Sequence, residues 1–172
     1  MLTRKNKKIR NPLKPYRPPR YGVVLESAGW VVLAATWLFV LISYEHLPYI
    51  IPTHFDAAGQ ADAYGAKSAI LMLPVISTVI FIVVSLVSFL PRMLSLKETL
   101  SPLEAGRKYG GIILLLVSTK LIMAAAFGYL AFRTIQQAKG NSAGLGGWFL
   151  PVFIALTFIP VLLFVTGRLR KT

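Results

Sequence analysis

Four long apolar runs set the limits of what this 172-residue chain can fold into. Each is about as long as a helix that crosses the hydrocarbon core of a bilayer, which takes roughly 20 residues at ~1.5 Å each. Backbone polar groups in lipid must be paired within their own segment, so the runs predict an all-α integral membrane protein with four transmembrane helices. The runs cover residues 27–44, 69–90, 111–132 and 148–167.

The distribution of charge predicts how these helices are threaded. Residues 1–20 hold eight Lys or Arg and no acid, the connector 91–110 holds four, and the residues after 167 hold three. Segments rich in Lys and Arg stay on the cytoplasmic side of a membrane. We therefore expect both termini and the middle connector in the cytoplasm, and the loop at residues 45–68 outside.

The chain divides accordingly into four parts. We expect a basic, proline-rich cytoplasmic tail (1–26), a helix–loop–helix unit (27–90), a cytoplasmic connector (91–110) and a helical hairpin with a basic tail (111–172). The sequence SPLE within the connector predicts that the third helix begins in the cytoplasm.

Basic residues near a membrane surface are attracted to anionic lipid head groups by about 1 kcal/mol each. We expect the N-terminal tail to contact such head groups, with a cytoplasmic partner as the alternative. Nucleic acid is not expected, because no basic domain studded with aromatic side chains accompanies the charge. The absence of cysteine excludes disulfides, thiolate metal sites and a cysteine nucleophile.

Lys120 is the basic residue near the centre of a predicted span. A charge there is costly and marks a candidate functional group. Ala124 and Gly128 follow on its face and allow a neighbouring helix to approach closely, so we expect Lys120 to point into the bundle or toward a partner. Glu26 is the acid close to a span, but helix rise puts the two roughly 13 Å apart in depth. The alternative is that Lys120 has no functional role and that its side chain extends toward the membrane interface.

The loop at residues 45–68 collects polar side chains. His46, His54, Asp56 and Asp62 could bind a divalent cation or share acid–base work. No paired-histidine spacing of a zinc enzyme is present. We therefore favour a loop without metal or cofactor, and keep the metal site as an alternative.

The same loop has the residues of a folded lid. Pro48 and Pro52 force the residues before them toward extended geometry. The tetrapeptide DAAG, residues 56–59, predicts a turn in which Gly59 takes a conformation that is costly for other residues. We expect a second turn at residues 62–65 and a helix cap at Ser68.

The stretch LPYIIPTHFDAAGQADAYGAK resembles the signature of the DUF1648 domain: Leu-Pro, then Pro-x-His-Phe-[Asn/Asp], then Gly-x-x-Asp and a final Lys. The resemblance covers about residues 28–90 and implies a protein of the bacterial cytoplasmic (inner) membrane, similar to SdpI-like multi-pass proteins, that recognises something outside the cell. The matching residues are Leu47, Pro48, Pro52, His54, Phe55, Asp56, Gly59, Asp62 and Lys67.

We therefore predict a non-enzymatic membrane protein that recognises a peptide, lipid or protein through its outer loop. Its role would be immunity, signalling or that of an accessory subunit. The residues expected to contact the ligand are His54, Asp56, Asp62 and Lys67, and those expected to hold the loop shape are Pro48, Pro52, Phe55 and Gly59. Two alternatives remain: a small transporter or channel component that uses Lys120, and a metal-assisted hydrolase centred on His54.

Overall fold

The computed structural model describes residues 20–97, 102–141 and 144–169. The helices are α1 (Arg20–Tyr44), α2 (Met72–Lys97), α3 (Pro102–Ala138) and α4 (Phe149–Leu169), with a short 3-10 helix η1 (Lys67–Leu71) before α2. Strands β1 (Ile50–Phe55) and β2 (Ala61–Ala66) form a hairpin between α1 and α2. All four long helices are apolar and long enough to cross a membrane, and the predicted helical membrane protein is confirmed at this level.

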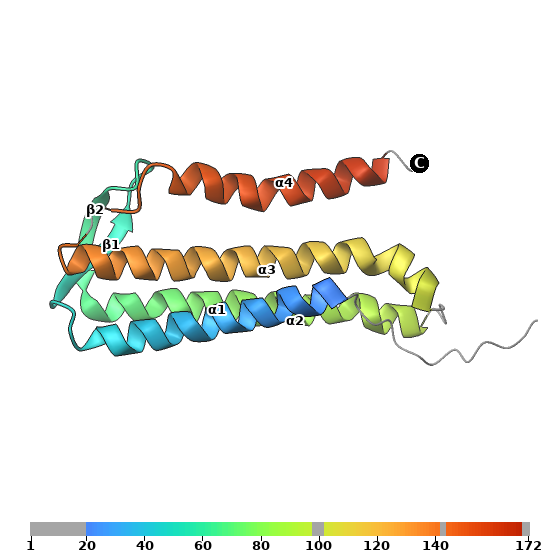
Figure 1. Cartoon of the computed structure of the whole chain (residues 1–172), viewed down its shortest axis with the longest axis horizontal. Helices are drawn as coiled ribbons and strands as arrows, with labels where there is room; N and C mark the ends of the chain where they lie inside the picture. The colour runs from blue at the N-terminus through green and yellow to red at the C-terminus, as the bar shows by residue number, and fades with distance from the viewer. Residues whose placement is uncertain (1–19, 98–101, 142–143, 170–172) are drawn as a thin grey trace, which may run out of the picture.

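The long helices alternate in direction, so the hairpin and the α3–α4 connection lie at one end of the molecule (Figure 1). We call this end, with β1, β2 and residues 139–141 and 144–148, the hairpin end. The α2–α3 connection lies at the opposite end, where α1 begins and α4 finishes. Helix α3 is central, because α1 and α2 both pack along it whereas they touch each other less. Helix α4 packs mainly on α3 and stands apart from the other two.

The helices extend further than the apolar runs predicted. Helix α1 already begins at Arg20, and α2 continues to Lys97. Helix α3 begins at Pro102, as expected, and runs for 37 residues; Ser101, its expected cap, lies outside the described residues. Most of the predicted connector 91–110 is therefore helical. Hydropathy marks the length of helix that suits lipid, whereas the backbone bonds of a helix can continue into water.

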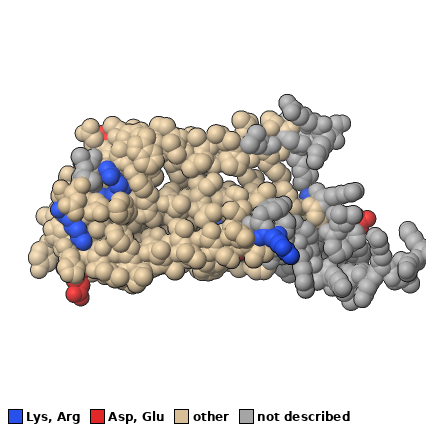
Figure 2. Space-filling view, in the orientation of Figure 1, with Lys and Arg blue, Asp and Glu red and all other residues tan. Residues whose placement is uncertain are grey.

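The interior is apolar along α3. At the hairpin end Val40, Ile51, Ile70, Ala131 and Ile135 form a cluster in which each side chain is at most 1% exposed. Its members come from α1, β1, η1 and α3, so burial of this cluster fixes the hairpin on top of the bundle. On the face shown in Figure 2, the middle of the molecule is almost free of charge.

Helices α1 and α3 approach each other closely at Gly128. A Cβ atom added there would lie 2.8 Å from the Thr36 hydroxyl oxygen, which is closer than packed atoms tolerate. Ala124, one turn earlier, is 1% exposed and packs with Leu33 and Phe81. The prediction that Ala124 and Gly128 allow a helix to approach is confirmed.

The hairpin differs from the predicted lid in its second half. Residues 61–66 form β2, so the predicted turn at residues 62–65 is wrong. The Ser68 cap is also wrong, because η1 begins at Lys67 after the extended residue Ala66 and has no side-chain cap. The reason is that the strand partner of residues 61–66 is β1, which supplies the backbone hydrogen bonds that a local turn would otherwise have provided.

The turn at residues 56–59 is confirmed. The Gly59 amide donates to the Asp56 carbonyl oxygen at 2.9 Å, and Gly59 has a φ of 78°. The Asp56 carboxylate accepts a hydrogen bond of 2.8 Å from the Gln60 amide. Glycine is needed at position 59 because this left-handed backbone conformation is costly for residues with a Cβ atom.

The α3–α4 connection is hydrogen-bonded to this turn and to α3. The Leu145 amide donates to the Gly59 carbonyl oxygen at 2.7 Å. The Tyr129 hydroxyl donates to the Leu145 carbonyl at 2.8 Å and the Arg133 Nε–H to the Gly144 carbonyl at 2.7 Å. Two segments more than eighty residues apart in the chain are thereby held together.

Gly59→Ala is expected to detach the α3–α4 connection from the hairpin turn. The added Cβ would lie 2.9 Å from the Gly146 carbonyl oxygen, a main-chain atom that cannot rotate away. Gly140→Ala is the matched control, since Gly140 has a similar φ of 77° but nothing within 4 Å of the added carbon. Both variants should lose roughly 1 kcal/mol through backbone strain. Only Gly59→Ala should accelerate hydrogen exchange of the Leu145 amide; equal protection in both variants would contradict the docking.

Candidate functional site

A cavity of about 670 Å³ lies at the hairpin end, between the hairpin, η1, α2, α3 and the start of α4. Its volume falls in the range of small-molecule sites, roughly 300–1,000 Å³. Most of its wall is apolar. The lining residues are Pro52, Thr53, His54, Phe55, Asp56, Ala57, Gly59, Ala69, Ile70, Met72, Leu73, Ile76, Leu130, Thr134, Leu145, Gly146, Phe149 and Leu150.

His54 is the imidazole in the cavity wall, and it is paired with Asp62. Its Nδ1 atom lies 2.6 Å from Asp62 Oδ1, and the two side chains are 68% and 47% exposed. The strand pairing explains how they meet. His54 pairs with Ala63, and register shifts on either side of His54 leave Thr53 and Asp62 as extra residues on their strands. Such bulges change where side chains point. Here they accompany a contact between His54 and Asp62, which are not directly opposite each other in the strand pairing.

Asp56 is the acidic residue among the described lining residues, which include neither Lys nor Arg. Its carboxylate caps the turn through the Gln60 amide. Thr134 of α3 is 3% exposed and contributes a hydroxyl to the wall. The cavity therefore combines an apolar body with a polar, acidic rim on the hairpin side.

Lys67 is not part of this cavity. Its ammonium lies 4.9 Å from the centre of the Tyr44 ring and 5.6 Å from that of Tyr49, and 3.5 Å from the Tyr44 carbonyl oxygen. A cation over aromatic faces is stabilised electrostatically. The arrangement ties the start of η1 to the end of α1, so the structure separates Lys67 from the three other predicted contact residues.

The predicted loop-shaping residues take different positions. Pro52 and Gly59 are buried and line the cavity, and Phe55 lines it as a half-buried ring. Pro48 is exposed in the connection between α1 and β1. Among the described residues, no three His, Cys, Asp or Glu side chains lie together in a group that could hold a metal ion.

A second polar cluster lies inside the bundle, around Lys120. Both carboxylate oxygens of Glu26 lie 2.5 Å from the Lys120 Nζ atom, and the Ser85 hydroxyl accepts a further bond of 2.9 Å. The ammonium also lies 4.6 Å from the centre of the Phe81 ring. Lys120 is 1% exposed and Glu26 35%. Charge-assisted bonds of this kind are the stronger ones in proteins, and this cluster joins α1, α2 and α3.

Lys120 and Glu26 are in direct contact, so the depth difference of roughly 13 Å that helix rise predicted for them is wrong. That estimate measured both residues from the starts of their apolar runs. Helix α3 begins 18 residues before Lys120, whereas α1 begins only six residues before Glu26, so α3 projects beyond the start of α1 (Figure 1). The lysine accordingly points inward to a partner within the chain, and it does not snorkel.

Comparison with known proteins bears on the hairpin and the helices beside it. Residues 31–78 match the family model described as a domain of unknown function, DUF1648. The DUF1648 resemblance is confirmed. Over 58 residues the chain is 34% identical to an uncharacterized protein of Archaeoglobus fulgidus. The aligned stretch covers 34% of this chain and 32% of that protein. The chain thus spans about a third of that relative. No solved structure gives a significant match.

The DUF1648 segment, residues 31–78, runs from α1 through the hairpin to the first turns of α2. It contains the His54–Asp62 pair and the part of the cavity wall that comes from the hairpin, η1 and α2. The rest of the wall comes from outside the segment, from Leu130, Thr134, Leu145, Gly146, Phe149 and Leu150. The DUF1648 segment alone therefore does not enclose the cavity.

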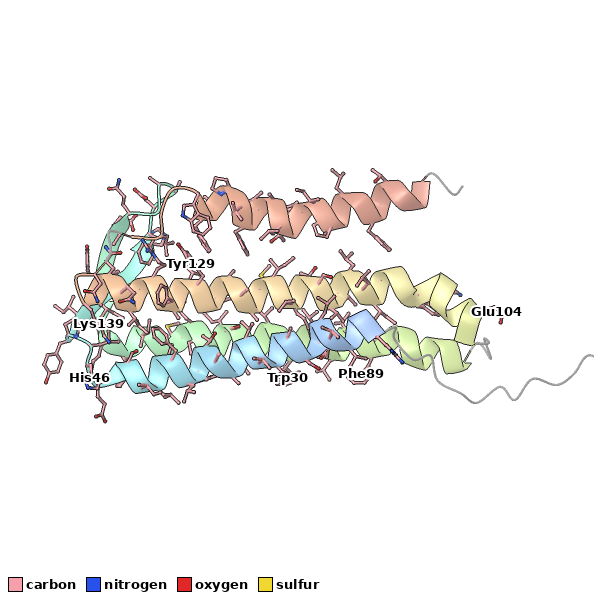
Figure 3. All side chains as sticks on the ribbon, viewed as in Figure 1. Trp30, His46, Phe89, Glu104, Tyr129 and Lys139 are labelled. Atoms are coloured by element: carbon pink, nitrogen blue, oxygen red, sulfur yellow. The ribbon has the colours of Figure 1, made fainter. Side chains whose placement is uncertain are left out.

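Sequence reasoning missed this second wall. Tyr129 lies on the side of α3 that faces α4 (Figure 3), and its ring stacks on Phe149 with centroids 5.1 Å apart. The cluster of glycines at 144, 146 and 147 was the available signal, since Gly144 and Gly146 have φ values of 85° and 84°. Several glycines in a short connection indicate close backbone approach as well as flexibility. Ser85 was missed because nothing in an apolar run marks which serine meets a charge.

Removing one member of the Lys120 cluster should destabilise the bundle. Lys120→Met leaves the Glu26 carboxylate without its cation, and we expect a loss of roughly 3 kcal/mol, the lower part of the range for breaking a buried ion pair, because Glu26 is partly exposed. The Glu26→Met, Lys120→Met double variant should recover most of that loss, since no charge is left unpaired. Thermal unfolding in detergent measures all three.

Lys139→Met is the matched control, because Lys139 is exposed at the hairpin end (Figure 3). It should change stability by less than about 0.5 kcal/mol. A double variant no more stable than Lys120→Met would show that the charge pair does not account for the role of Lys120.

Proposed function

We propose that this protein is a non-enzymatic membrane protein that binds a membrane amphiphile, with its apolar part in the cavity at the hairpin end. The observation that carries the proposal is the cavity itself, which combines a mainly apolar wall with polar groups gathered on the hairpin side. Sites for small molecules have this composition: a hydrophobic lining and a few polar groups that fix orientation.

The position of the cavity supports a ligand that comes from the membrane. Its α2, α3 and α4 walls lie within the candidate spans Lys67–Leu90, Lys108–Ala138 and Phe149–Thr166. Three wall residues remain partly open to the surroundings: Met72 is 59%, Ile76 38% and Leu150 40% exposed. Openings are visible between α4 and the rest of the bundle (Figure 2). An acyl chain could enter from the side without crossing water.

The distribution of Lys and Arg in the sequence bears on which side of the membrane the hairpin end faces. The positive-inside pattern of the sequence favours the hairpin end on the outer side of the membrane. The polar rim would then meet the outer leaflet. Recognition of a secreted peptide or a protein partner at the same end, as in immunity, signalling or accessory subunits, stays a prediction.

The transport alternative draws less support. The Lys120 ammonium already has two charged oxygens, one hydroxyl and one aromatic face around it. A residue with these partners acts as a link between α1, α2 and α3, and a transported ion would have to displace them. The alternative of a metal-assisted hydrolase at His54 needs further metal ligands beside His54 and Asp62. Among the described residues, no third His, Cys, Asp or Glu joins them.

Filling the cavity should abolish retention of lipid. Ile76→Trp places a larger side chain at a cavity wall residue on α2, and Ile82→Trp makes the same change six residues further along, outside the lining. We expect native mass spectrometry of the purified protein to find a bound lipid in the wild type and in Ile82→Trp. Ile76→Trp should retain much less.

The comparison holds only if both variants remain folded, which equal thermal unfolding curves in detergent would establish. A wild-type protein that retains no lipid and binds none added back would refute the proposal. Equal retention by both folded variants would also refute it, because the lipid would then bind elsewhere.

A further inference from the structure

We propose that the ligand of the cavity carries a hydrogen-bond-donating, cationic head: a primary ammonium group on an apolar chain. This inference rests on the proposed function and adds the chemistry of the head group. Three observations carry it: the His54–Asp62 pair, the sign of the charges at the rim, and the position of the apolar chamber.

The His54–Asp62 pair decides what the imidazole can offer. An ionised carboxylate only accepts hydrogen bonds, so the 2.6 Å contact requires the proton to lie on the His54 Nδ1 atom. In the neutral ring the Nε2 atom is then an acceptor with a free lone pair. Within the part of the chain that the structure describes, Asp62 is the partner found for this ring. A ligand that meets Nε2 of the neutral ring must therefore donate.

The charges at the rim agree with a donor that is also a cation. Asp56 lies in the cavity wall and Asp62 lies directly behind His54. The lining residues that the structure describes include no Lys or Arg, and the nearby Lys67 is held over the Tyr44 and Tyr49 rings. Arg133 is held by its bond to the Gly144 carbonyl and is not among the lining residues. An anionic head would therefore face two carboxylates with no Lys or Arg in the described lining to offset them, whereas an ammonium group would be attracted to both.

The apolar part of the cavity, away from the hairpin, favours a lipid over a peptide. The α2, α3 and α4 walls lie in candidate membrane spans, and Met72, Ile76 and Leu150 are apolar and partly open on that side. An acyl chain needs no hydrogen bonds there. A peptide backbone would carry N–H and C=O groups into an apolar wall that offers few partners. We therefore infer an amine-bearing lipid or single-chain amphiphile.

A series of amphiphiles with one tail and different heads tests the inference. The probes are hexadecylamine, hexadecanol, hexadecyltrimethylammonium and palmitate, each added to the full-length protein in neutral detergent micelles. Native mass spectrometry measures the bound fraction. We expect hexadecylamine to bind best, because it has both the N–H donor and the charge. The trimethylammonium probe keeps the charge without a donor, hexadecanol keeps a donor without the charge, and palmitate should bind least.

Variants then locate the preference. Asp62→Asn removes one negative charge at the rim. It also replaces a carboxylate that can only accept with an amide that can donate as well, so the His54 proton is no longer fixed on Nδ1. The variant should reduce the preference for hexadecylamine over palmitate by roughly three- to tenfold. Glu45→Gln is the matched control, since it removes an exposed acid near the same end that is not in the lining. It should leave the preference unchanged.

The outcomes separate the two proposals. If Ile76→Trp abolishes binding of every probe but the wild type binds palmitate as well as hexadecylamine, the cavity is a lipid site and the head-group inference is wrong. An unchanged preference in Asp62→Asn also overturns it. Displacement of hexadecylamine by an apolar peptide with a free amine at lower concentration would make the occupant a peptide. Binding of no probe to the wild type would refute the proposed function itself.

Discussion

The contact between Gly59 and the α3–α4 connection is the constraint on which the cavity depends. The bond from the Leu145 amide to the Gly59 carbonyl joins the hairpin turn directly to the α3–α4 connection. The contact is possible because both sides are bare backbone: a Cβ atom on Gly59 would meet the Gly146 main chain, and one on Gly144 would meet the Gly59 carbonyl. Glycine at both positions therefore lets the two main chains approach to hydrogen-bonding distance.

The Lys120 cluster and the cavity lie at different positions along α3. Near its middle, α3 is joined to α1 and α2 by an ion pair with Glu26 and a hydroxyl contact with Ser85. Polar bonds of this kind give helix association a direction that apolar packing alone lacks, because lipid is as apolar as the side chains. Further along, α3 turns its other face to α4, where the rings of Tyr129 and Phe149 stack. Helices α1, α2 and α3 are thus joined by polar bonds, whereas the start of α4 is held on α3 by ring stacking.

The sequence predicted what depends on local composition. Apolar length predicted the four helices, DAAG predicted the turn, and the small residues after Lys120 predicted a face turned inward. It did not predict what depends on pairing between distant segments. The bulges at Thr53 and Asp62 arise from the register of two strands, and alternation along one strand carries no information about its partner. For the same reason the α3 and α4 walls, and Ser85 as a partner of Lys120, could not be found from their own positions.

The boundary of the DUF1648 segment has a physical consequence for specificity. The segment holds the His54–Asp62 pair and Asp56, which are the groups that we propose select a head. The apolar wall from Leu130 to Leu150 lies outside it and sets the room for a tail. Head and tail recognition then belong to different parts of the chain, joined through the Gly59 contact. A chain that keeps the segment but differs beyond it would preserve the polar corner and reshape the chamber, because no side chain of the segment closes the α4 side.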